Sequence, residues 1–259
     1  MHTLRNTTAA GLFALGASLV SSACVDNESS LFVLGIFKLS STQCLAEPDS
    51  NAVMLAQGVL DRQFARGYRA ALLVGSHLTE RGSREKLRTE TSRLQIEGAH
   101  IEIFGTTGGS TSFDSPATGL ANPSSGTDPG LAAVFSQFIR PEDMGDPNTP
   151  DDYGVLGPPG QIIVRVKVFG TTLGGQEIES GAYDFPILVC DGCLLTYPPD
   201  ASDPDAPQAE GYRCSADADT AQEATICSLG QDDAIPCTYC ASYSDICRNP
   251  NLNPSLNGN

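Results

Sequence analysis

The sequence predicts an all-β protein, an immunoglobulin-like β-sandwich followed by a small, disulfide-stapled C-terminal module. About seven short segments rich in strand-forming residues are separated by turns and loops, which is typical of a sandwich. Only one segment carries a fair helical pattern. Five cysteines then fall between Cys214 and Cys247 with few apolar residues among them, so this stretch needs covalent bridges to hold a structure.

The first half of the chain contains two predicted strands and the ambiguous segment. Residues 31–37 are an apolar run that is too short for a helix and rich in strand formers. Residues 51–66 place apolar side chains at helical spacing, although Gly58 lowers the stability of a helix there. The apolar positions of this pattern are Val53, Ala56, Leu60 and Phe64. Residues 68–74 follow as a strand.

The remaining strands lie between residues 93 and 189. In residues 93–104 the parity of the apolar side chains changes at Gly98, as a β-bulge would produce. Residues 132–140 are a further strand, residues 161–180 form the clearest hairpin, and residues 183–189 are the last strand. The segments between them, 106–130 and 141–160, are rich in turn residues and are expected to be long loops.

The N-terminus has the layout of a secretory signal peptide. Arg5 precedes an apolar stretch over residues 9–20, and the small residues Ser21-Ser22-Ala23 come before Cys24. This stretch is shorter than the roughly 20 residues that a membrane-spanning helix needs. An ordinary signal peptidase could cleave after Ala23. The segment also resembles a bacterial lipobox, which implies that Cys24 is acylated, although Ser21 stands where leucine is commonest.

The cysteine count favours lipidation. The chain has nine cysteines, and an odd number would leave a free thiol in an oxidising compartment. If Cys24 carries lipid, the others can all pair, and we predict disulfides among Cys44, Cys190, Cys193, Cys214, Cys227, Cys237, Cys240 and Cys247.

Charge and composition limit the partners. The formal net charge of −16 makes nucleic acid a poor partner, and no cofactor is predicted. The expected partners are the membrane, through the acyl anchor, and a protein or polysaccharide ligand. Because Val25 is not the usual signal for retention in the inner membrane, we expect the outer membrane, with secretion as the alternative.

These features divide the chain into five parts. They are a signal peptide (1–23), a lipid-anchor tether (24–30), the β-sandwich domain (31–197), a cysteine-rich module (198–248) and a disordered tail (249–259). The module opens with an acidic, proline-rich linker, and the tail has few apolar residues that could pack.

Four stretches resemble a family of uncharacterised cysteine-rich lipoproteins predicted in myxobacterial genomes. They are residues 68–74 (YRAALLV), 88–98 (RTETSRLQIEG), 185–193 (FPILVCDGC) and 227–237, which includes Gly230-Gln231-Asp232 and Pro236. The resemblance implies an exported β-domain with a cysteine-bonded tail, and a strand in the second half of residues 51–66. It implies no activity, because none is known for the family.

The two Cys-x-x-Cys pairs could serve another chemistry. Cys190 with Cys193 and Cys237 with Cys240 have the inner spacing of a zinc site. Exported thiols are oxidised, however, which favours structural disulfides. A redox role is the third alternative, but Asp191 between the sulfurs disfavours a thiolate, and no helix is predicted to begin there. The alternative function is therefore an exported metal-binding or thiol-redox protein.

No catalytic, cofactor-binding or metal-binding residue is predicted. His77 and His100 are interpreted as strand residues, since no nucleophile elbow lies near either. Two groups of acidic residues lack the pattern of an EF-hand loop and are interpreted as solvated loops. They comprise Asp200, Asp203 and Asp205, and Asp146, Asn148, Asp151 and Asp152.

Basic residues gather in residues 62–93, while the chain beyond Pro141 is acidic. This segment either binds an acidic polysaccharide or lipid, or faces the acidic tail of the same chain, and the second explanation is the more common arrangement.

A specific disulfide can be predicted from sandwich topology. If the first strand lies parallel to the last, Cys44 bonds to Cys190 or Cys193, and the other six cysteines pair mainly within Cys214–Cys247 with one link back to the domain. The protein is then expected to be a non-enzymatic envelope lipoprotein with a structural or binding role at the cell surface.

Overall fold

The computed structural model describes residues 30–39, 44–83, 86–146, 149, 151–197, 214 and 226–256. The signal peptide, Cys24 and the acidic residues Asp200, Asp203 and Asp205 lie outside the described residues. Within the described ranges no helix has both the length and the apolar character to cross a membrane.

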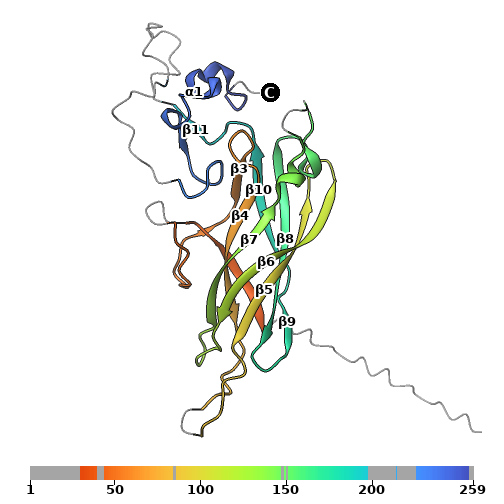
Figure 1. Ribbon diagram of the computed structural model, residues 1–259, viewed down its shortest axis with the longest axis vertical. Helices are drawn as coiled ribbons and strands as arrows, with labels where there is room; N and C mark the ends of the chain where they lie inside the picture. The colour runs from red at the N-terminus through yellow and green to blue at the C-terminus, as the bar shows by residue number, and fades with distance from the viewer. Residues whose placement is uncertain are drawn as a thin grey trace, which may run out of the picture.

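Two sheets pack face to face and confirm the all-β sandwich (Figure 1). The first sheet has the order β2 (Met54–Leu55), β1 (Leu31–Phe37), β4 (Tyr68–Ser76) and β7 (Gly130–Ile139). The second has the order β3 (Gly58–Asp61), β10 (Tyr183–Cys190), β8 (Gly160–Thr172), β5 (Leu94–Phe104) and β6 (Ser110–Ala121), and β9 (Glu177–Glu179) pairs with β8. The chain between β7 and β8 contains two short 3-10 helices, η2 (Pro141–Met144) and η3 (Gly154–Leu156).

The core lies between the inner faces of the two sheets. Alternate residues of β8 are buried, with Val164, Val166 and Val168 facing inward as the hairpin pattern predicted. Near one end of the sandwich, Tyr68, Phe138 and Phe185 form a cluster of fully buried rings whose centroids are 6.3 Å apart. The bulge is confirmed as well, because the register of β5 shifts between Ile96 and Gly98.

Two predictions about local structure were wrong. Residues 51–66 contain β2 and β3 rather than the helix that their apolar spacing indicated. β3 lies about where the resemblance implied a strand, because Leu60 and its neighbours complete the second sheet beside β10. Residues 106–130 include the 12-residue strand β6 rather than only a loop. The buried positions of β6 are the small residues Ser115, Ala117 and Ala121, and its exposed positions include the apolar Leu120 among polar residues. The strand therefore carries no clear apolar alternation.

The C-terminal module has little regular structure. β11 (Leu195–Thr196) pairs with β12 (Ile235–Pro236), and three short helical turns follow: η5 (Cys237–Tyr239), α1 (Asp245–Arg248) and η6 (Pro250–Leu252). Its buried cluster contains Leu195 and Ile235 together with four cysteines. Leu194 and Tyr197, in the last residues of the predicted sandwich domain, also pack against this cluster. The module lies at one end of the elongated sandwich, beside the ends of β3 and β10 (Figure 1).

The part of the predicted disordered tail that the structure describes is folded. Asn253 is fully buried and its side-chain amide donates to the Gly192 carbonyl over 2.9 Å. Ser255 donates to the same carbonyl over 3.1 Å. Residues 249–256 therefore pack just beyond the end of β10. Hydrogen bonds from polar side chains hold them there, although the segment has few apolar residues.

The disulfides correct the predicted pairing of Cys44. Cys44 bonds to Cys227, Cys190 bonds to Cys193, Cys214 bonds to Cys237, and Cys240 bonds to Cys247. The prediction failed because β1 pairs with β4 and β2, whereas the strand that runs parallel to β10 is β3. The presence of disulfides is confirmed, and one of them joins the module to the segment that follows β1.

Candidate functional site

The module docks on the sandwich through the loop Gly230-Gln231-Asp232. This loop runs antiparallel to β3 with a bridge between Leu60 and Gln231. The Asp61 amide donates to the Gly230 carbonyl over 2.8 Å, and the Asp232 amide donates to the Val59 carbonyl over 3.1 Å. Gly230 has a φ of 78°, the left-handed conformation that glycine adopts readily. The loop thus continues the second sheet beyond its edge strand.

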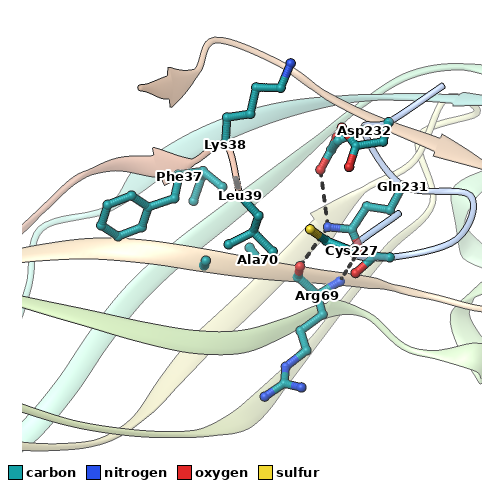
Figure 2. A pocket seen from close by; sticks show the side chains of 12 residues that line it. Phe37, Lys38, Leu39, Arg69, Ala70, Cys227, Gln231 and Asp232 are labelled. Atoms are coloured by element: carbon teal, nitrogen blue, oxygen red, sulfur yellow. Dashed lines mark hydrogen bonds between the residues drawn. The ribbon is translucent and has the colours of Figure 1, made fainter. Parts of the chain in front are cut away.

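The Gln231 side chain reaches the first sheet. Its amide oxygen accepts from the Arg69 backbone N–H over 3.0 Å, and its Nε2 donates to the Arg69 carbonyl over 2.7 Å (Figure 2). A side-chain amide therefore occupies the place of a neighbouring strand at the start of β4, where β1 has no paired residue. Because its backbone extends one sheet and its side chain pairs with the other, Gln231 closes the sandwich at this corner.

The side chain of Asp232 contacts both sheets at the same corner. Its carboxylate accepts from the Val59 N–H and from the Tyr68 hydroxyl, both over 2.8 Å. Burial raises the pKa of Asp232 above its ordinary value, although these donors act in the opposite direction. Burial and the neighbouring Asp232 carboxyl also raise the pKa of Tyr68. The Tyr68 hydroxyl is therefore a hydrogen-bond donor at physiological pH rather than an acid.

Asp61 organises the Cys190–Cys193 turn. Its carboxylate accepts from the backbone N–H groups of Gly192 over 2.7 Å and Leu194 over 3.0 Å. Burial raises the pKa of Asp61, and the backbone N–H donors partly oppose this. One Asp61 oxygen and the two sulfurs lie within 4.8 Å of one another, but the sulfurs are joined to each other and cannot act as thiolate ligands in this state.

The two Cys-x-x-Cys pairs do not combine into one site. Cys190 and Cys193 bond to each other, whereas Cys237 and Cys240 bond to Cys214 and Cys247. The Cys190–Cys193 turn is held by Asp61, by the tail residues Asn253 and Ser255, and by neighbouring charges. Asp191 within it forms a salt bridge of 2.9 Å with Arg62. This set of contacts is what a structural turn requires.

An open groove with arginine walls lies beside the docking loop. It has a volume of about 610 Å³ and runs between the start of β4, the end of β7 and the module. Arg66 and Arg69 are exposed on it, and neither forms an ion pair within the part of the chain that the structure describes. The Arg69 guanidinium points away from Gln231 (Figure 2) and lies 4.9 Å from the centre of the Phe135 ring. Two uncompensated cations beside an apolar ring can bind an anionic ligand.

Each of the two explanations of the basic segment fits some of the arginines near the groove. Arg62 faces an acidic residue of the same chain, as internal charge complementarity predicts. Arg140 at the far side of the groove is also paired, with Asp143 over 2.8 Å, and this hydrogen bond raises the pKa of Arg140. Arg66 and Arg69 lack such partners, so these two arginines of the basic segment remain available to a ligand in the groove.

The other candidate residues do not line this groove. His77 stacks on Phe32, and His100 contacts Asp114 and Glu179 on the outer face of the second sheet. Asp146 and Asp152 lie on an adjoining cleft of about 210 Å³, which Arg62 and Arg66 also line. The Asp146 backbone N–H donates to the Asp152 carboxylate over 2.9 Å and shapes the loop between η2 and η3. Sequence reasoning missed the roles of Asp61, Gln231 and Asp232, since no local pattern indicates them.

Comparison with known proteins adds no further information on function. No family model matches the chain, and the curated proteins and the solved structures contain no significant match.

Proposed function

We propose that the protein is a non-enzymatic lipoprotein of the outer membrane that acts as a binding module at the cell surface. Its anchor is the acyl group on Cys24. Its ligand is an acidic polysaccharide that binds in the groove lined by Arg66 and Arg69. The other cell-envelope functions that the sequence suggests, metal binding and thiol exchange, have less support because the contacts around Cys190–Cys193 are those of a structural turn.

The relative position of the tether and the groove carries this proposal. Leu31, the first residue of β1, pairs with Ser76 at the end of β4. Arg69 lies near the other end of β4 and contacts the module. A strand of this length spans roughly 25–30 Å. A domain anchored before Leu31 therefore presents the groove on the side that faces away from the membrane.

The positive charge of the groove indicates an anionic ligand. The chain has a formal net charge of −16, so most of its surface repels anions. Two exposed guanidinium groups in a groove reverse this charge locally and match carboxylate groups spaced along a polysaccharide. The ring of Phe135 lies under the Arg69 guanidinium, 4.9 Å from the ring centre, and supports its position.

Binding is tested by electrophoresis in native gels that contain polygalacturonate, a carboxylated polysaccharide. Wild-type protein should be retarded, and Arg66→Ala or Arg69→Ala should each weaken binding about fivefold, as expected for one exposed charge contact of about 1 kcal/mol. Arg81→Ala is the matched control, because it removes an equal exposed charge near the opposite end of β4. Absence of retardation, or an equal effect of all three substitutions, would contradict the proposed ligand site.

The anchor is tested separately by cell fractionation. Wild-type protein should sediment with the membranes, and Cys24→Ala should move to the soluble fraction because it lacks the acylated residue. Intact mass of the wild-type protein should exceed that of the mature polypeptide by the mass of the acyl groups. If both proteins fractionate as soluble, Cys24 is not an anchor.

A further inference from the structure

A fully exposed leucine stands at the tip of the loop between β4 and β5. Leu87 is 93% exposed, more than any other large apolar side chain that the structure describes as exposed. Its φ of 51° is in the left-handed region, which leucine rarely adopts. Ser83 and Arg88 exchange two backbone hydrogen bonds of 3.0 and 2.9 Å and close the tip. The folded domain gains no burial from Leu87.

A second exposed leucine lies at the same end of the sandwich. Leu173, in the turn between β8 and β9, is 54% exposed. Its backbone N–H donates to the Arg93 carbonyl over 2.9 Å, and the N–H of Gly174 donates to the Thr91 carbonyl over 2.9 Å. The base of the Leu87 loop and the β8–β9 turn are therefore neighbours, and both lie at the end opposite to the module (Figure 1).

This end is also where the tether leaves the sandwich. The carbonyl of Ser30 accepts from the N–H of His77 over 2.9 Å, one residue beyond β4. Six peptide units separate Cys24 from Ser30, and an extended chain of that length spans at most about 20 Å. A membrane that holds Cys24 is therefore close to the loop that begins at His77.

The flanks of Leu87 carry positive charge. Lys86 and Arg88 are both exposed, and neither forms an ion pair within the described residues. The nearby Glu90 carboxylate is already engaged, because it accepts from the backbone N–H groups of Arg81 over 3.0 Å and Gly82 over 2.7 Å. An apolar side chain between two cations is suited to a phospholipid membrane, which has an apolar interior and phosphate groups at its surface.

We propose that residues 86–88 form a second membrane contact, in which Leu87 enters the headgroup layer and Lys86 and Arg88 bind phospholipid phosphates. The inference rests on the proposed anchoring of the chain before Leu31. The strongly negative domain does not bind such a membrane unaided, and the tip makes contact because the anchor holds it there. Together the tether and the tip fix the orientation in which the arginine groove faces outward.

The test replaces the natural anchor so that its result does not depend on Cys24. The full mature chain from residue 25, with an N-terminal hexahistidine tag, is bound to vesicles of phosphatidylethanolamine, phosphatidylglycerol and a nickel-chelating lipid. A fluorophore on Thr89→Cys reports on the tip while Leu87 is retained. The same fluorophore on Leu252→Cys, an exposed position in the module, is the matched control. Nitroxide-labelled lipids in the vesicles quench any fluorophore at the headgroup layer.

Quenching at position 89 should be at least about fivefold greater than at position 252. Leu87→Asp should reduce it to the level of position 252, and Lys86→Glu with Arg88→Glu should reduce it by at least half. Equal quenching at the two positions would overturn the membrane contact, and an unchanged signal in the charge-reversed variant would overturn the role of the two cations. Strong quenching at position 89 together with soluble wild-type protein in cell fractionation would mean that the Cys24 anchor fails while the contact stands.

Discussion

The sandwich and the C-terminal module differ in what holds them together. The sandwich buries rows of valine, isoleucine and leucine between two sheets, and the described residues of this core include no cysteine. The buried cluster of the module has seven members, four of them cysteines, and its sheet is a pair of two-residue strands. The sandwich is stabilised by burial of apolar surface, whereas the module is stabilised by disulfides and by its contacts with the sandwich.

The junction shows the consequence of that difference. A module with so small a core cannot fix its own position by packing, so its position depends on directional contacts. Gln231 and Asp232 supply hydrogen bonds to both sheets, and Cys44–Cys227 supplies the covalent link. The groove lined by Arg66 and Arg69 therefore depends on the oxidised module, although both arginines belong to the sandwich.

Removal of the long-range disulfide should have the largest effect. Cys44 and Cys227 are separated by 183 residues, so their bond restricts the unfolded chain strongly and Cys44→Ala with Cys227→Ala should lower the free energy of unfolding by about 5 kcal/mol. Cys190→Ala with Cys193→Ala is the control, because a separation of 3 residues corresponds to only about 2 kcal/mol. Urea denaturation measures both, and equal losses would break the comparison.

A core substitution in the sandwich should lower the free energy of unfolding by slightly less. This loss should be the same whether the disulfides are oxidised or reduced. Phe185→Ala removes a fully buried ring that packs with Tyr68 and Phe138, and should lower the free energy of unfolding by about 4 kcal/mol. The loss should persist in the reduced protein. Leu188→Ala on the same strand is partly exposed and should change stability by less than about 1 kcal/mol. A loss that disappears on reduction would contradict the independence of the sandwich.

A substitution in the docking loop should reduce stability by an intermediate amount, and only at the junction between sandwich and module. Asp232→Ala leaves the Val59 N–H and the Tyr68 hydroxyl without their acceptor and should destabilise the junction by about 3 kcal/mol. Hydrogen exchange at Val59 and limited proteolysis of the module should both increase. Asp233→Ala, one residue along the same loop, is the control and should leave both unchanged.

The smallest expected effect is a pH dependence that originates at the junction. Burial raises the pKa of Asp61 and of Asp232 in the folded protein above the ordinary carboxyl value. The folded state therefore binds protons more tightly, so stability should rise as pH falls from neutrality towards the raised pKa values and be lost as pH rises through them. The melting temperature should therefore be higher at pH 5 than at pH 7. Asp232→Asn should flatten this difference, and a stability that falls between pH 7 and pH 5 would contradict it.

Strands with a clear two-residue period could be predicted from the sequence, and the bulge at Gly98 could be predicted from one change of parity. The strand β6 could not, because its buried residues are small and its exposed residues mix polar side chains with Leu120. The candidate groove was predicted only as a cluster of basic residues. Arg62 is paired because Asp191 approaches it from a distant part of the chain, whereas Arg140 pairs with Asp143 three residues along.

By itself the sequence determined the all-β class, most strand positions and the need for disulfides in the C-terminal module, since these follow from periodicity and composition over short windows. Only the tertiary structure decided that Cys44 meets Cys227, that Gln231 pairs with Arg69, and that Asp61 holds the Cys190–Cys193 turn. The physical reason is distance along the chain. Eight cysteines allow 105 connectivities, and the choice among them depends on which strand ends meet in space, a property that no local pattern of residues contains.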